Sequence, residues 1–62
     1  MPEVYVHALK GRSPEQKRAL MKDISDAVVK HFNVPMEAVM VEIVEADPAG
    51  KMKNGILFSE RQ

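Results

Sequence analysis

Hydrophobic and polar residues alternate in two separate segments of the chain, residues 2–9 and residues 39–46. In the first segment the two sides of an extended strand would carry Val4, Val6 and Ala8 on one side and Tyr5, His7 and Leu9 on the other. In the second segment they would carry Val39, Val41 and Ile43 on one side and Met40, Glu42 and Val44 on the other. Because apolar residues occur on both sides, we expect two strands with at least partial cover on each face.

The segment between the two strands has the periodicity of an amphipathic helix from Pro14 to about Phe32. Apolar residues recur there at spacings of three and four, and charged residues occupy much of the opposite side. Ser13 is placed to cap the helix, with Gln16 positioned to complete a capping box. Asn33 suits the left-handed conformation that ends a helix, and the proline two residues later prevents its continuation.

A strand, a helix and a second strand form a β-α-β unit, so we expect parallel strands joined by a right-handed crossover. Residues 53–55 contain a turn signal, and the apolar residues 56–58 after it predict a short hairpin or an edge strand. The expected fold class is therefore α/β (α+β), a single β-α-β unit with a short C-terminal hairpin. One helix covers only one sheet face, and the other apolar face would be left open in a monomer. The pattern thus predicts an oligomer.

The composition excludes several classes of function. The chain has 62 residues, no cysteine, and nine basic residues balanced by nine acidic ones. We expect one domain over residues 1–62 without disulfides or thiolate metal sites, and no electrostatic affinity for nucleic acid. No apolar stretch approaches the ~20 residues that cross a bilayer, and no secretory signal begins the chain. The expectation is a cytoplasmic protein without a membrane partner.

Pro2 directly follows Met1, so removal of Met1 would turn the proline nitrogen into a free secondary amine. A terminal amine has a reference pKa of ~7.7 to 8.0, and burial or a nearby cation lowers that pKa toward the range of an effective general base. A proline at the first position of a strand is also an ordinary structural feature, so the residue alone leaves both interpretations open.

Arg12 lies between Gly11 and the helix cap, where its guanidinium would emerge beside a helix N-terminus that favours anions. An arginine there can bind a carboxylate through two hydrogen bonds, although a solvated loop charge is an equal alternative. The two histidines lack a third nitrogen or sulfur ligand, so we expect no metal site. Glu42 is a mid-strand carboxylate that could face solvent, and Lys51 could add positive potential near an anion site.

The chain resembles the 4-oxalocrotonate tautomerase family in four features that are spread over nearly its whole length. These features are the Met1-Pro2 start, the segments Leu9-Lys10-Gly11-Arg12-Ser13 and Glu15-Gln16-Lys17, and the closing Asn54-Gly55 pair. The resemblance implies β-α-β subunits that pair into dimers, with three dimers forming a homohexamer. It also implies an N-terminal proline in a mostly apolar pocket between subunits.

By the same resemblance, Pro2 is the general base and then the general acid that interconverts the enol and keto forms of a small 2-oxo acid. No cofactor is required. Arg12 matches the arginine that binds a substrate carboxylate, commonly from a neighbouring subunit, and Leu9 matches an apolar wall residue.

Two positions depart from the family pattern. The second arginine, which polarises the 2-oxo group, is replaced by Met40, and a thioether cannot donate a hydrogen bond. The tail position that carries an aromatic wall residue in the family corresponds here to Lys51 or to a residue beside it. Loss of an aligned cation typically costs ~10²-fold or more in rate. Lys51, or a different chain in a mixed hexamer, could supply the missing charge.

Two alternatives follow from these departures. One is a related hydratase or dehalogenase, in which a carboxylate such as Glu42 activates water. The other is a non-catalytic structural subunit of a mixed hexamer.

Overall fold

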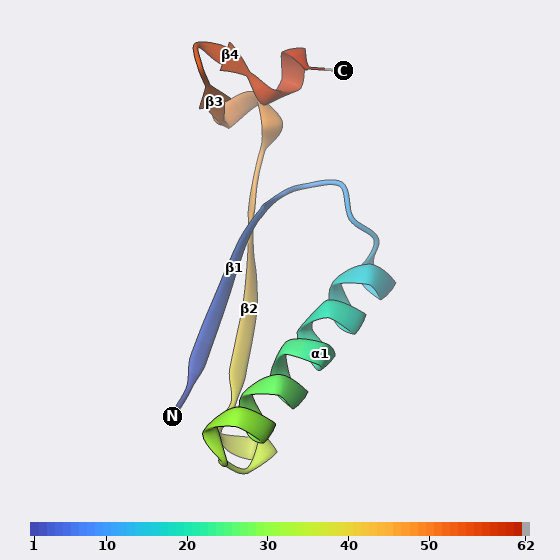
Figure 1. The fold of residues 1–62 in the computed structure, drawn as a ribbon. Helices are drawn as coiled ribbons and strands as arrows, with labels where there is room; N and C mark the ends of the chain where they lie inside the picture. Colours follow the sequence, from blue (N-terminus) through green and yellow to red (C-terminus); the bar gives the residue numbers. More distant parts are fainter. Residues whose placement is uncertain (62) are drawn as a thin grey trace.

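The computed structural model describes residues 1–61 and confirms the β-α-β unit with a C-terminal strand pair (Figure 1). Strand β1 (Glu3–Leu9) and strand β2 (Met40–Ala46) are parallel, and helix α1 (Pro14–Phe32) connects them. The strand register pairs Val4 with Val41 and Val6 with Ile43. The predicted second strand began at Val39, one residue too early. The Val39 N–H instead donates to the Met36 carbonyl and closes a single 3₁₀ turn, η1 (Met36–Ala38).

Both ends of α1 form as the sequence predicts. The Gln16 N–H donates to the Ser13 hydroxyl oxygen, and the Ser13 N–H donates to the Gln16 side-chain oxygen, which is a complete capping box. At the other end Asn33 has a φ of 56°, and its N–H donates to the Val29 carbonyl. Local sequence therefore determines where the helix begins and ends.

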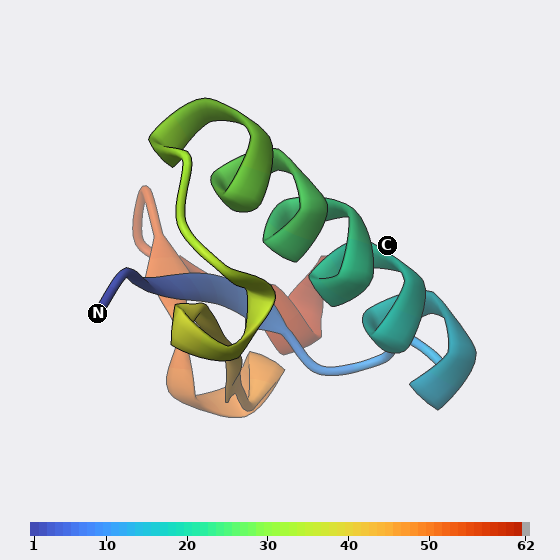
Figure 2. The same cartoon turned by 90° about the horizontal axis from the view of Figure 1, so that it is seen from below.

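Helix α1 lies on one side of the strand pair, and the other side has no such cover (Figure 2). Exposure alternates along both strands up to their last residues, Leu9 and Ala46, with the residues facing α1 half-buried and their neighbours exposed. The open face exposes apolar side chains, with Tyr5 at 49%, Met40 at 38% and Val44 at 36% exposure. The predicted uncovered apolar face is thus present in the chain.

A single copy of this chain does not build a complete core. Among residues 1–61 no residue is buried. The Cα radius of gyration is 14.7 Å, whereas a compact chain of this length has about 11 Å. The elongated subunit leaves apolar surface that its own helix cannot cover, which is the condition for oligomerisation that the sequence predicted.

The tail extends beyond the C-terminal end of β2 and folds on itself (Figure 1). It comprises η2 (Pro48–Gly50), β3 (Met52–Lys53), β4 (Ile56–Leu57) and η3 (Phe58–Glu60), and β3 and β4 pair antiparallel. Asn54 and Gly55 have φ values of 56° and 77°, so both central residues of the hairpin turn are left-handed, as a type I′ turn requires. The predicted hairpin is confirmed.

Within the described residues, no helix has the length and hydrophobicity needed to cross a bilayer.

Candidate active site

The N-terminal end of the strand pair brings Pro2 and Met40 together. The Met40 N–H donates a 3.0 Å hydrogen bond to the Pro2 carbonyl oxygen, which fixes the backbone of Pro2 against the first residue of β2. Pro2 is half-buried, and the Met40 side chain is on the open face of the sheet. The residue predicted as a base and the position of the missing arginine are therefore neighbours in one chain.

The opposite end of β1 brings Leu9 and Arg12 together. Gly11 turns the chain between them with a φ of 129°, a conformation that favours glycine. Leu9 and Arg12 both line a hollow at this turn, and they also line a second cavity, of about 230 Å³, between α1 and the sheet. Arg12 is exposed and forms no ion pair with any carboxylate of residues 1–61. Its guanidinium is thus available to an anion from outside the chain.

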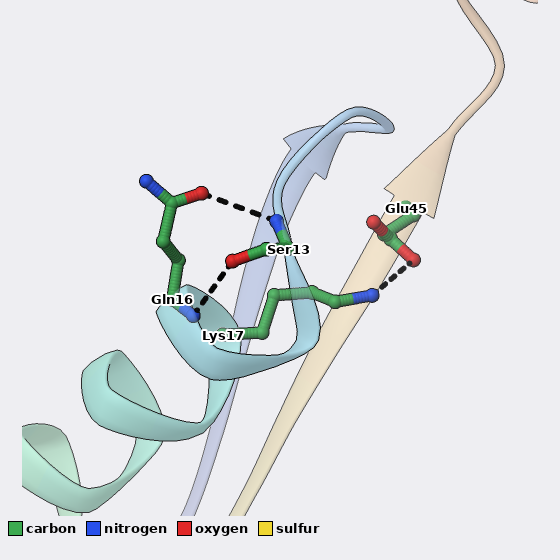
Figure 3. A network of polar contacts seen from close by, with 4 residues as sticks. All are labelled: Ser13, Gln16, Lys17 and Glu45. Carbon is green, nitrogen blue, oxygen red and sulfur yellow. Dashed lines mark hydrogen bonds and ion pairs between the residues drawn. The ribbon is translucent and has the colours of Figure 1, made fainter.

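An ion pair joins the first turns of α1 to the end of β2 beside this cavity (Figure 3). The Lys17 ammonium lies 3.2 Å from the Glu45 carboxylate, and the two side chains are 28% and 26% exposed. Lys17 follows the capping box directly, so the cap and the ion pair together orient the start of α1 over β2. The loop that carries Arg12 enters the helix at this fixed point.

Pro2 and Arg12 are not brought together within one chain. They flank β1 at its two ends, and a seven-residue strand spans roughly 20 Å at about 3.3 Å per residue. Figure 1 shows the N-terminus and the loop between β1 and α1 at opposite ends of β1. A site containing both residues requires a second copy of the chain, or a different partner chain.

The tail places Lys51 near a residue that the sequence analysis did not single out. The Lys51 ammonium is 5.8 Å from the centroid of the Phe58 ring, and the Arg61 guanidinium carbon is 5.0 Å from the same centroid. Arg61 also donates a 2.9 Å hydrogen bond to the Lys53 carbonyl. The spacing of three residues between Phe58 and Arg61 is the signal that could have found this contact, because i and i+3 share one side of a 3₁₀ turn.

The remaining candidates lie on the open face of the sheet. Glu42 is exposed and pairs in register with Tyr5, whose hydroxyl donates a 2.7 Å hydrogen bond to Glu3. That hydrogen bond, with the negative charge of Glu3 and smaller effects of desolvation and of Glu42, raises the pKa of Tyr5 above its ordinary value of 10.0. His7 is exposed on the same face. Among residues 1–61 there is no cluster of three potential metal ligands.

Comparisons with known proteins agree with this arrangement. A family model described as "Tautomerase enzyme" matches residues 2–60. A "Probable tautomerase" of Bradyrhizobium diazoefficiens is 46% identical over 61 residues, which cover 98% of this chain and 91% of that protein. A 2-hydroxymuconate tautomerase of Pseudomonas putida is 40% identical over 45 residues, 73% of this chain and 71% of that protein.

A solved structure shows the same fold over the full length. A heterohexamer 4-oxalocrotonate tautomerase from Chloroflexus aurantiacus superimposes with a TM-score of 0.89 and 34% identity, and the match covers 100% of both chains. The chain therefore belongs to the 4-oxalocrotonate tautomerase family. The family names support an isomerase of the keto–enol tautomerase type.

Proposed function

We propose that this protein is a cofactor-free tautomerase that interconverts the enol and keto forms of a small 2-oxo acid, with Pro2 as general base and general acid. The observation that supports it most directly is the placement of Pro2. This residue is half-buried at the start of β1, and the Met40 hydrogen bond holds its carbonyl in place, within a chain of the tautomerase family. Removal of Met1 would leave the nitrogen as an amine at a fixed position.

The proposed reaction needs only one proton carrier. A neutral terminal amine, with a reference pKa of ~7.7 to 8.0, accepts the enol O–H proton while the C=C electron pair shifts and the ketone C=O forms. The protonated proline then delivers a proton to the carbon terminus of the conjugated system. The amine returns to its starting state, and no electrons are gained or lost overall.

Arg12 and Leu9 would complete this site from another copy of the chain. Because they lie at the opposite end of β1 from Pro2, an antiparallel arrangement of two copies would place the Arg12 of one beside the Pro2 of the other. Arg12 would bind the substrate carboxylate, Leu9 would form an apolar wall, and Lys51 would add positive potential from the tail. A homohexamer built as a trimer of dimers would repeat this composite site and cover the open sheet faces.

The test compares three forms of the protein. The Pro2→Ala variant should lose ketonisation of phenylenolpyruvate, followed by ultraviolet absorbance, while its native mass spectrum shows the wild-type assembly. A second variant with one alanine inserted between Met1 and Pro2 keeps the proline ring but converts its nitrogen to an amide. It should be equally inactive. Intact mass must first show that the wild-type protein begins at Pro2. Undiminished turnover in either variant would overturn the assignment of Pro2.

A second candidate function is that of a structural subunit in a mixed hexamer. It is favoured by Met40 at the position of the second arginine and by the likeness to a heterohexamer subunit from Chloroflexus aurantiacus. In that case the Pro2-terminated protein alone would ketonise no simple enol. It would instead form a stoichiometric complex with a second tautomerase-like chain, detectable by co-purification and native mass spectrometry.

A further inference from the structure

The tail concentrates positive charge that the rest of the chain does not balance locally. Residues 51–61 contain Lys51, Lys53 and Arg61 against the single carboxylate of Glu60, although the whole chain has no formal net charge. The Glu60 carboxylate accepts a 3.0 Å hydrogen bond from the Leu57 N–H. None of the three tail cations forms an ion pair with a carboxylate in the described residues.

Two of these cations are held at one aromatic ring. Lys51 and Arg61 both lie over Phe58, at 5.8 Å and 5.0 Å from its centroid. Attraction to the ring face positions each cation, but two like charges near one ring repel each other. An anion bound between or beside them would relieve that repulsion, which makes the pair a better anion receptor than either cation alone.

The backbone around the ring limits how far the pair can move. The Phe58 N–H donates a 2.9 Å hydrogen bond to the Lys51 carbonyl, and the Arg61 N–H donates to the Phe58 carbonyl at 3.2 Å. The Arg61 guanidinium is held by its hydrogen bond to Lys53, which leaves most of its N–H donors free. A planar guanidinium fixed in this way suits two-point binding of a carboxylate.

We propose that Arg61, together with Lys51, binds a second carboxylate of the substrate, so that the protein selects dianionic enol acids over monoanionic ones. This inference rests on the proposed function. Pro2 lies at the N-terminal end of the β1–β2 pair, whereas Arg12 and the tail both lie beyond its C-terminal end. An antiparallel second copy that places its Arg12 near Pro2 would therefore also bring its tail toward that Pro2. Arg12 would bind one carboxylate and the Lys51–Arg61 pair the other. The cationic pair thereby supplies charge in a site where Met40 supplies none.

The binding experiment uses two unreactive acids that differ only at one end. Muconate is a dienoic dicarboxylate, and sorbate has the same carbon skeleton with a methyl group in place of one carboxylate. Isothermal titration of the assembled wild-type protein should give tighter binding of muconate than of sorbate. The Arg61→Gln variant should weaken muconate binding by ~10-fold or more and leave sorbate binding unchanged. The Arg61→Lys variant should retain part of the preference, because it keeps the charge and loses the two-point geometry.

Arg18→Gln is the matched control, because Arg18 is an exposed arginine on α1 outside the site. It removes the same bulk charge and should leave both affinities unchanged. Equal binding of muconate and sorbate by the wild type, an equal loss of both in Arg61→Gln, or the same loss in Arg18→Gln would each overturn the proposal. If muconate selectivity depends on Arg61 while Pro2→Ala leaves enol turnover intact, the dianion site stands and the catalytic role of Pro2 fails.

Turnover gives a second readout in the active protein. The ratio of kcat/KM for 2-hydroxymuconate to that for phenylenolpyruvate should fall ~10-fold or more in Arg61→Gln, mainly through KM. If the ring contact had a purely structural role, Arg61→Gln would lower kcat/KM for both substrates equally. An unchanged ratio would therefore contradict the proposal.

Discussion

The Met40 N–H donates a 3.0 Å hydrogen bond to the Pro2 carbonyl, so the first residue of β2 is tied to the proline proposed as the catalytic base. In the family pattern this position carries an arginine that would polarise the substrate's 2-oxo group. The thioether of Met40 offers no hydrogen-bond donor there. Position 40 is therefore adjacent to Pro2 along the strand pair, and its side chain carries no cation.

Restoring that cation should increase activity. We expect Met40→Arg to raise kcat/KM for a 2-oxo acid enol by up to ~10²-fold, because a guanidinium would stabilise the negative charge that develops on oxygen. Steady-state ketonisation kinetics measure the change. Met40→Leu is the control, since it preserves apolar volume without charge and should match the wild type. A Met40→Arg protein that assembles normally and is no faster than Met40→Leu would contradict this prediction.

The separation of Pro2 and Arg12 predicts complementation between two inactive variants. Pro2→Ala and Arg12→Gln should each be inactive alone, but co-assembled in equal amounts they should regain roughly a quarter of wild-type turnover. In random mixtures one site in four combines an intact Pro2 with an intact Arg12 from another chain. Activity is measured after joint refolding, with native mass spectrometry to verify mixing. A fully mixed but inactive assembly would exclude a site shared in this way.

The single tyrosine of the chain provides a spectroscopic test of the open sheet face. Glu3 accepts the Tyr5 hydrogen bond and raises the Tyr5 pKa above 10.0. Because the folded pKa exceeds the unfolded value, the stabilising effect is complete below pH 10.0 and is lost as the pH rises through the folded pKa. Absorbance of tyrosinate should show a midpoint that Glu3→Gln lowers toward 10.0.

Glu42 and Glu37 provide the comparison for that titration. Glu42→Gln should lower the Tyr5 midpoint less than Glu3→Gln does, because its charge is the smallest of the causes that raise the pKa. Glu37→Gln in η1 should not move the midpoint. An unchanged midpoint in Glu3→Gln would show that the hydrogen bond does not control the titration.

The Lys17–Glu45 ion pair should couple the two residues by ~0.5–1 kcal/mol in the free energy of unfolding. Its side chains are 28% and 26% exposed, so solvent screens it only in part. A double-mutant cycle with Lys17→Met and Glu45→Gln measures this energy by urea unfolding at one fixed protein concentration. The Lys22–Asp26 pair, with side chains 59% and 52% exposed, should couple by only ~0.3–0.5 kcal/mol. Equal coupling in the two pairs would mean that the partial burial of Lys17 and Glu45 adds nothing.

The features that could be predicted from the sequence depend on neighbours along the chain. Ser13 and Gln16 are three residues apart, and Asn54 and Gly55 are adjacent, so their cap and turn geometries follow from local backbone preferences. The apolar open face also followed from local alternation, because side chains of a strand point to opposite faces with a period of two. These regularities do not require knowledge of any contact distant in sequence.

The contacts around the candidate site depend on the three-dimensional path of the chain. Alternation in residues 39–46 does not say that Glu45 will meet Lys17 across 28 positions, nor that Lys51 and Arg61 will share the Phe58 ring. Likewise, Pro2 and Arg12 are only ten residues apart in sequence, and an extended strand separates them in space. By itself the sequence determined the elements, the two ends of the helix and the apolar sheet face that α1 leaves uncovered. The tertiary structure decided which charges meet and that no single copy can join Pro2 to Arg12, because strand length and the direction of the tail are properties of the assembled fold.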